Sequence, residues 1–409
     1  MLAIVAAVAL GGPLLTVSTA VADLTPPEPL PLGGYTERAD KLLEPGGEPL
    51  AARVIVWKQG AMRVAMVSAD MLTIPESLAR EVRGKIPGDV KLFLVATHTH
   101  SAPDSQMLND RMTFKIPGIA NYKRRWLDWY AERIASGVRQ ALASSGTPAA
   151  AVDVWERHVE ANRPRRAGGW SDSMLTLVGG TGGKGMPRWF AHYAAHAVVY
   201  GADNLQTHPD FPTPLLRRLG AFAFFPGAIG DVSPRADGPD APQRMADFLS
   251  RFQGGEPVPR VVAQGEDPLV WTSEPIALDA PAPHPDFAKA YGVPDAIAQL
   301  VVKQFAPKEA EVRAFRIGKL AIVGIPGEPT GAVGRSIRDA GRRFGFDPVL
   351  VVSHVDGWIG YILEPDDYRR GGYEATLSFN GPDTGTRVEA ASERALRRLA
   401  RSGLSLRRP

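Results

Sequence analysis

The order of the predicted elements between residues 52 and 100 most constrains the fold. Residues 52–75, ARVIVWKQGAMRVAMVSADMLTIP, read as two strands joined by a turn at Lys58-Gln59-Gly60. The charged stretch ESLAREVRGKI then indicates a helix, and VKLFLVATHTH returns to a strand-like run. Because strands and helices alternate here, the chain favours a layered α/β fold over an all-β one.

The rest of the chain extends this pattern. NYKRRWLDWYAERIASGVRQALASS has apolar residues at helical spacing and ends before Gly146. Further strands are predicted at AVDVWERHVE, MLTLVGG and DPVLVVSHVDGW, and VRAFRIGKLAIVGIPGEPTG reads as a hairpin. Residues 237–310 are rich in Pro and Asp, which predicts long loops around short helices. We expect one α/β domain over residues 18–409, with a layered mixed sheet, helices on its faces and long loops at the site.

The composition limits the chemistry that the chain can support. There is no cysteine, so disulfides are excluded and any metal must be held by His, Asp, Glu, Tyr or water. The 47 basic and 44 acidic residues give a net charge of +3, which is too balanced to indicate nucleic-acid binding. The basic C-terminal stretch RALRRLARSGLSLRRP is typical of a solvated helix face, and a peripheral contact with an anionic membrane surface is the alternative.

The first 22 residues contain no charged side chain. Residues 1–17 resemble the apolar part of a signal peptide or a membrane anchor, and STAVA offers a small-residue cleavage pattern. The usual basic start is missing, Gly11-Gly12-Pro13 interrupts the run, and VSTAVADLTPP also reads as the first strand of the domain. The balance favours export to a secreted or periplasmic location, with membrane anchoring through this segment as an option.

Two pairs of histidines stand out. His98 and His100, in LFLVATHTHSAPDS, lie two apart at the end of a predicted strand and so share a face, at the edge where α/β sheets bind ligands. A lone HxH is a weak signal, so it supports a functional and a structural role equally. His192 and His196 are four apart, which places them on one face of a helix or of a strand alike. For His192 a core or surface position is favoured over a metal-ligating one.

Three further stretches carry polar groups that suit a site. Ser233 in AIGDVSPRADG follows an apolar run, although it and Asp231 could simply bond to the backbone of their own turn. Glu328 in GIPGEPTG directly follows a strand, where a rigidly held carboxylate suits a metal site. The segment GYILEPDDYRRGGYEA holds three spaced tyrosines, which on their own indicate only packing.

Taken together, these stretches resemble the neutral ceramidase family of zinc-dependent amidases. DLTPPEPLPLGGYTER is similar to the opening stretch of that family, and THTHSAP to its Thr-His-Thr-His-Ser-Gly-Pro. ANRPR resembles its Asn-Arg-Ser segment, AAHAV its His-Pro-Thr segment, and GDVSPR its Gly-Asp-Val-Ser-Pro-Asn. GEPT and the spaced tyrosines complete the series in the family's order.

The resemblance implies roles at matching positions. Four residues would bind Zn²⁺: His98, His196, Glu328 and Tyr361. Four would line the reaction centre: His100, Arg163, Ser233 and Tyr373. The implied reaction is hydrolysis of the amide bond of N-acylsphingosine, or of a related small-molecule or lipid amide, by zinc-activated water. Ser233 as the attacking nucleophile is the rival scheme, but no base is paired with it in the sequence.

Several positions depart from the family pattern. Ala102, Ala197 and Arg235 replace its Gly, Pro and Asn, and we expect no separate C-terminal β-sandwich domain. Because the metal ligands are retained, these changes bear on the substrate more than on the metal. A hydrolase of the same fold that acts on another amide or ester is therefore the main alternative. A TIM-barrel amidohydrolase and a non-catalytic module that binds a metal, a carbohydrate or a lipid are the others.

Overall fold

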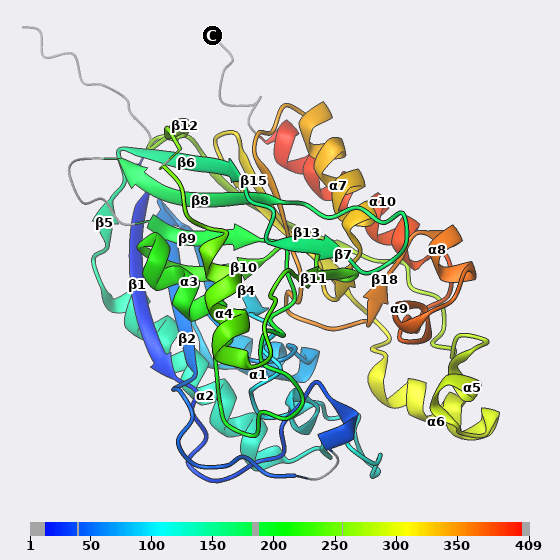
Figure 1. Ribbon diagram of the computed structural model, residues 1–409. Helices are drawn as coiled ribbons and strands as arrows, with labels where there is room; N and C mark the ends of the chain where they lie inside the picture. The colour runs from blue at the N-terminus through cyan, green and yellow to red at the C-terminus, as the bar shows by residue number, and fades with distance from the viewer. Residues whose placement is uncertain (1–12, 39–40, 182–187, 256, 403–409) are drawn as a thin grey trace, which may run out of the picture.

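Three sheets carry the fold of the computed structural model, which describes residues 13–38, 41–181, 188–255 and 257–402 (Figure 1). The strands of the first sheet are β1 (Thr16–Asp23), β2 (Ala51–Gln59), β3 (Met62–Ala69), β4 (Val90–Ala96) and β5 (Thr147–Pro148). Their order across the sheet is β4-β3-β2-β1-β5. The sheet is mixed, because β2 and β3 are antiparallel whereas β3 and β4 are parallel.

The other two large sheets follow later in the chain. The second consists of β6 (Ala151–His158), β8 (Met174–Thr181), β9 (Arg188–Tyr193), β10 (Ala221–Pro226) and β12 (Arg260–Gln264). The third consists of β13 (Leu269–Pro275), β14 (Glu311–Ile317), β15 (Leu320–Gly324) and β17 (Val349–Val352). Two short pairs lie near the ends of these strands: β7 (Asn162–Pro164) with β11 (Val232–Pro234), and β16 (Glu328–Pro329) with β18 (Tyr361–Ile362).

Ten α-helices are described, and most of them cover the outer faces of the sheets. They are α1 (Glu76–Lys85), α2 (Arg124–Ala143), α3 (Pro212–Leu219), α4 (Ala241–Ser250), α5 (Phe287–Tyr291), α6 (Asp295–Phe305), α7 (Gly331–Arg343), α8 (Pro365–Arg369), α9 (Tyr373–Thr376) and α10 (Thr384–Arg401). Helices α1 and α2 pack on the first sheet, α3 and α4 on the second, and α7 and α10 on the third. In Figure 1, α5 and α6 project beside this layered body.

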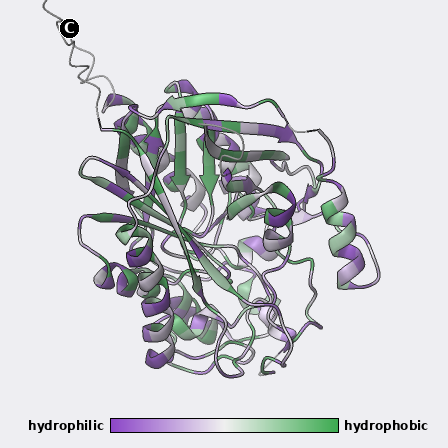
Figure 2. Cartoon of the chain, turned by 90° about the vertical axis from the view of Figure 1, so that its left-hand side faces the viewer, coloured by the Kyte–Doolittle hydropathy of each residue, from purple (hydrophilic) through white to green (hydrophobic). Residues whose placement is uncertain are grey.

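The inner faces of the three sheets meet in one apolar core. Its members come from all three sheets, among them Trp57, Phe93, Phe190, Phe225 and Phe315. Each such side chain contributes about 1.5–3 kcal/mol by its burial. Figure 2 shows apolar stretches along the strands, whereas the outer helices carry both apolar and hydrophilic residues. The core thus fixes the strand ends from which the candidate site is built.

The predicted α/β class with a layered mixed sheet is confirmed. Residues 237–310 hold more regular structure than predicted, since β12 and β13 lie there besides the helices. Ser233 lies in the short strand β11 and not in a tight turn. Both strands were missed because their alternation is irregular: Val261 of β12 is 53% exposed beside a break in its register.

The predicted membrane anchor at the N-terminus was wrong, whereas most of the predicted signal segment lies outside the described residues. Residues 1–12 lie outside the described part of the chain, and Leu15 onward belongs to the domain, with Leu15 fully buried. The STAVA pattern lies inside β1, which pairs with β2 along its whole length. No helix within the described residues has the length and apolarity needed to span a membrane. The apolar character of residues 15–22 is that of a core strand.

Candidate metal centre

His98 lies two residues beyond the end of β4. Its backbone φ is 67°, a left-handed conformation that few residues other than glycine adopt. The backbone N–H donates to the carbonyl of Met71 (3.0 Å), and Nδ1 lies 2.7 Å from the carbonyl oxygen of Leu72. A proton on Nδ1 satisfies that carbonyl and leaves the lone pair on Nε2 free. The loop therefore presents a buried imidazole in one orientation.

His196 and Glu328 are held in the same manner. The backbone N–H and the Nδ1 of His196 lie 3.1 and 3.0 Å from the carbonyl oxygen of Val232, next to Ser233 on β11. Glu328 follows β15 and is 2% exposed. Its Oε1 accepts a hydrogen bond from Nε1 of Trp358 at 2.8 Å. Each side chain thus has one polar atom held by a hydrogen bond within the protein and a second polar atom free to bind a metal ion.

These three side chains converge although they are far apart in the sequence. Oε2 of Glu328 lies 3.5 Å from Nε2 of His98 and 3.2 Å from Nε2 of His196. One ligand atom from each lies within 4.8 Å of the others, and all three residues are buried. Burial lowers the pKa of His98, and burial with the charge of Arg165 lowers the pKa of His196 to about 3. Two neutral imidazole nitrogens and a carboxylate oxygen are a donor set that fits a divalent metal ion such as zinc.

Two of the predicted tyrosines lie beside this cluster. Tyr361 on β18 is the parallel-strand partner of Glu328 on β16, so the two side chains share a face. Burial and the nearby Glu328 raise the pKa of Tyr361 well above its usual range. The Tyr373 ring lies 5.7 Å from that of Tyr361 and is 55% exposed. Tyr368 instead packs on His284, at 4.6 Å between ring centres. Zinc ligation by Tyr361 stays a prediction.

His100 lies at the edge of the cluster. Its Nε2 is 3.4 Å from Nε2 of His98, and the ring of Tyr35 packs 4.9 Å away. A Cβ at Gly34, where φ is +91°, would lie 2.3 Å from Nδ1 of His100. The buried Arg38 donates to the carbonyl of His100. Burial lowers the pKa of His100 well below its usual range, so the imidazole is neutral at physiological pH. Its catalytic role stays a prediction.

Arg163 and Ser233 face each other on β7 and β11. Arg163 is exposed and Ser233 is half-buried, and their assigned roles stay predictions. A second arginine, Arg165, lies with its guanidinium carbon 5.9 Å from the centre of the Tyr361 ring. Its Nε donates to Glu374 at 3.1 Å. The structure therefore brings Arg165 into direct contact with a predicted ligand.

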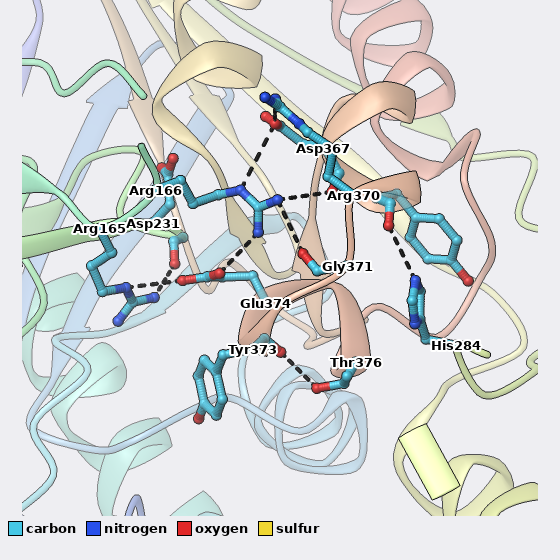
Figure 3. A network of polar contacts seen from close by, with 12 residues as sticks. Arg165, Arg166, Asp231, His284, Asp367, Arg370, Gly371, Tyr373, Glu374 and Thr376 are labelled. Atoms are coloured by element: carbon cyan, nitrogen blue, oxygen red, sulfur yellow. Dashed lines mark hydrogen bonds and ion pairs between the residues drawn. The ribbon is translucent and has the colours of Figure 1, made fainter. Parts of the chain in front are cut away.

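The contacts of Arg165 belong to a larger network around α9 (Figure 3). Arg165 and Arg166 converge on the two carboxylate oxygens of Glu374, each at 3.1 Å. Arg166 also donates to the backbone carbonyls of Asp367 and Gly371, at 2.9 and 3.1 Å. Because Glu374 follows Tyr373 directly, these bonds tie the position of Tyr373 to the strand that carries Arg163.

His192 takes a core position, one of the two that were favoured over metal ligation. It lies on β9, buried, with Nε2 2.9 Å from the carbonyl oxygen of Val351. It is not a member of the candidate metal group formed by His98, His196 and Glu328. The spacing to His196 was uninformative because β9 ends at Tyr193 and the chain turns before His196.

Sequence reasoning missed three residues at the centre: Arg165, Trp358 and His354. The ring of His354 stacks on that of His98, at 4.2 Å between ring centres and 21° between planes. His354 and Trp358 both lie in VVSHVDGW, where polar groups follow a predicted strand. That is the same signal that singled out His98, and it could have been applied here. Arg165 carried no signal beyond its nearness to Arg163.

Comparisons with known proteins bear on the fold. The sequence matches no protein-family model and no curated protein. Among solved structures, the neutral ceramidase from Pseudomonas aeruginosa is similar with a TM-score of 0.77 and 17% identity, over 95% of this chain and 75% of that one. A ceramidase complexed with C2 gives a TM-score of 0.77 and 18% identity, over 97% of this chain and 76% of that one. The chain therefore has the fold of neutral ceramidase, which confirms at the level of the fold the resemblance seen in its motifs.

Proposed function

We propose that this protein is a zinc-dependent hydrolase that cleaves the amide bond of N-acylsphingosine or of a related lipid amide. The observation that carries the proposal is the convergence of His98, His196 and Glu328 within 4.8 Å, in a chain with the fold of neutral ceramidase. Tyr361, which shares a face with Glu328, is the proposed fourth ligand. Zinc bound there would supply Lewis acidity, which lowers the pKa of water and polarises a carbonyl group.

The side chains around the ligands suit the proton transfers of amide hydrolysis. His100 is neutral and lies 3.4 Å from the ligand nitrogen of His98, so it can accept a proton at the centre and return it to a leaving amine. Arg165 beside Tyr361 brings a positive charge that can offset the charge developing on the carbonyl oxygen. We propose that Arg163, Ser233 and Tyr373 contact the substrate around this point.

An apolar substrate is supported by the surroundings of Trp358. This residue, which holds the ligand carboxylate, packs against an apolar cluster that includes Phe287, Phe305 and Phe379. The cluster continues into α5 and α6, which expose Tyr291, Ile297 and Leu300 at 40%, 44% and 47%. Tyr291 also lies 3.4 Å from the hydroxyl of Thr376 on α9. A buried apolar cluster beside Trp358 thus leads to helices with exposed apolar side chains, a setting that suits an acyl chain.

A hydrolysis screen in excess zinc tests the proposal. N-acylsphingosine is compared with short soluble N-acyl amides and with esters, and Glu328→Ala is the control variant. We expect release of the fatty acid from N-acylsphingosine by the wild type and none by the variant. Equal rates for the two proteins would refute a metal-centred reaction. Activity confined to soluble amides or to esters would refute the ceramide assignment and favour the alternative substrate class.

A further inference from the structure

The segment of residues 353–356 joins all three sheets beneath the candidate metal centre. The backbone N–H of Ser353 donates to Pro226 at the end of β10, at 3.1 Å. That of His354 donates to Gly327, immediately before Glu328, at 3.0 Å. That of Asp356 donates to Leu94 on β4, at 2.9 Å. The segment therefore fixes, relative to one another, the strand ends that carry His98 and Glu328.

The side chain of His354 points from this segment into the centre. It is fully buried, and its ring lies nearly parallel to that of His98, with 4.2 Å between the ring centres. Within the described residues, neither ring nitrogen of His354 hydrogen-bonds to a protein group. Its contact with His98 is therefore made through the face of the ring. The backbone φ of 58° is a left-handed conformation that aims the side chain at this position.

This stacking supplies a constraint that His98 otherwise lacks. The bond between Nδ1 of His98 and the carbonyl of Leu72 fixes one point on the ring. A ring held at one point can still tilt about that point, which would move its Nε2 away from Glu328. A flat neighbour at van der Waals distance removes the tilt. Contacts of this kind around a ligand orient it and raise the affinity for the metal.

We propose that His354 is a positioning residue of the metal centre, and that its ring sets the plane of His98 by face-to-face stacking. The inference rests on the proposed function, because it assumes that His98 is a metal ligand. His354 itself is not among the residues whose ligand atoms lie within 4.8 Å of one another. Its effect is therefore exerted on zinc affinity and on the geometry of the ligands.

The test compares His354→Asn, which removes the ring, with His354→Phe, which retains a flat one. Asparagine tolerates positive φ, and His354→Gly serves in its place if the first variant does not fold. Zinc affinity is measured by competition with a chelator, and ligand geometry by the visible spectrum of the cobalt-substituted protein. We expect His354→Asn to weaken zinc binding about 10- to 100-fold and to alter the cobalt spectrum. His354→Phe is expected to restore both.

Asp356→Asn is the matched control. Asp356 lies in the same segment, has the same φ of 58° and pairs with Arg313 at 3.2 Å. Its substitution should lower the melting temperature and leave zinc affinity unchanged. Unchanged zinc affinity in His354→Asn would overturn the inference, as would an equal loss in Asp356→Asn or no recovery in His354→Phe. A wild-type protein that binds no zinc would instead refute the proposed function, and the inference with it.

Discussion

Removing the carboxylate of Glu374 should both destabilise the protein and impair the proposed reaction. Glu374 is 5% exposed and accepts hydrogen bonds from Arg165 and Arg166. The side chains of these arginines are 26% and 14% exposed, so neither charge is fully compensated by solvent. Glu374→Ala leaves two half-buried guanidinium groups without their shared partner and frees Tyr373 from its anchor.

The structure bounds the size of the effect. Breaking a buried ion pair by removing one partner lowers the free energy of unfolding by about 3–5 kcal/mol. In this variant Arg166 still donates hydrogen bonds to the carbonyls of Asp367 and Gly371, and Arg165 still donates one to the carbonyl of Gly230. Because Arg165 is also partly solvated, we expect a loss of about 2–3 kcal/mol for Glu374→Ala. Glu374→Gln keeps the shape and one acceptor, so it should lose about 1–2 kcal/mol.

Equilibrium urea unfolding, followed by tryptophan fluorescence, measures these losses. Asp366→Ala is the control, since Asp366 is 90% exposed and its pair with Arg369 lies on the surface. That variant should stay within about 0.5 kcal/mol of the wild type. The kcat/KM for the lipid amide should fall about 10- to 100-fold in Glu374→Ala through misplacement of Tyr373. A Glu374→Ala protein as stable as the control would show that Glu374 is not a stabilising partner of the two arginines.

Three further predictions concern single side chains. Trp358→Phe removes the indole N–H that orients the ligand carboxylate, so its dissociation constant for zinc should rise about tenfold in chelator competition; an unchanged constant would contradict this. Glu389 lies beside Glu364, the residue just before α8, and burial together with the negative charge of Glu364 raises the pKa of Glu389 from 4.5 to about 7. A carboxyl group with a raised pKa in the folded state stabilises the fold at low pH, and this stabilisation is lost as the pH rises through about 7. Glu389→Gln should therefore remove about 1–2 kcal/mol of the fall in unfolding free energy between pH 5 and 8. Identical pH profiles of the two proteins in urea unfolding would count against this. Gly34→Ala would place a Cβ 2.3 Å from Nδ1 of His100 at a φ of +91°, whereas a Cβ at the control position Gly84 would meet open space. Gly34→Ala should therefore lower kcat/KM and Gly84→Ala should not. Equal effects of the two substitutions would argue against a fixed His100 imidazole.

The parts of the fold that the sequence predicts are those set by local pattern. The strands around residues 52–96 and the helix α2 are marked by alternation and by helical spacing, and the structure has them. His98 and Glu328 could be located because each directly follows an apolar strand. The stretch from Leu15 to Ala22 was misread because a membrane anchor and a core strand share the same apolar composition. Only its pairing with β2, some thirty to forty residues on, distinguishes them.

The contacts between distant segments could not be predicted. The stacking of His354 on His98 depends on how the first and third sheets pack, and no local pattern encodes that packing. Which of Arg163 and Arg165 lies beside Tyr361 likewise depends on where α9 places Glu374, the carboxylate that binds Arg165. In both cases the residue types were visible in the sequence, whereas their neighbours were set by the tertiary fold.

The zinc content of purified protein decides whether His98 helps to hold a metal ion. It is measured by elemental analysis for the wild type, His98→Ala and His100→Ala, together with hydrolysis of N-acylsphingosine by each protein. We predict about one zinc ion per chain in the wild type and in His100→Ala, none in His98→Ala, and activity in the wild type alone. A wild type without zinc, or a zinc-free His98→Ala protein that hydrolyses the substrate at the wild-type rate, would contradict this prediction.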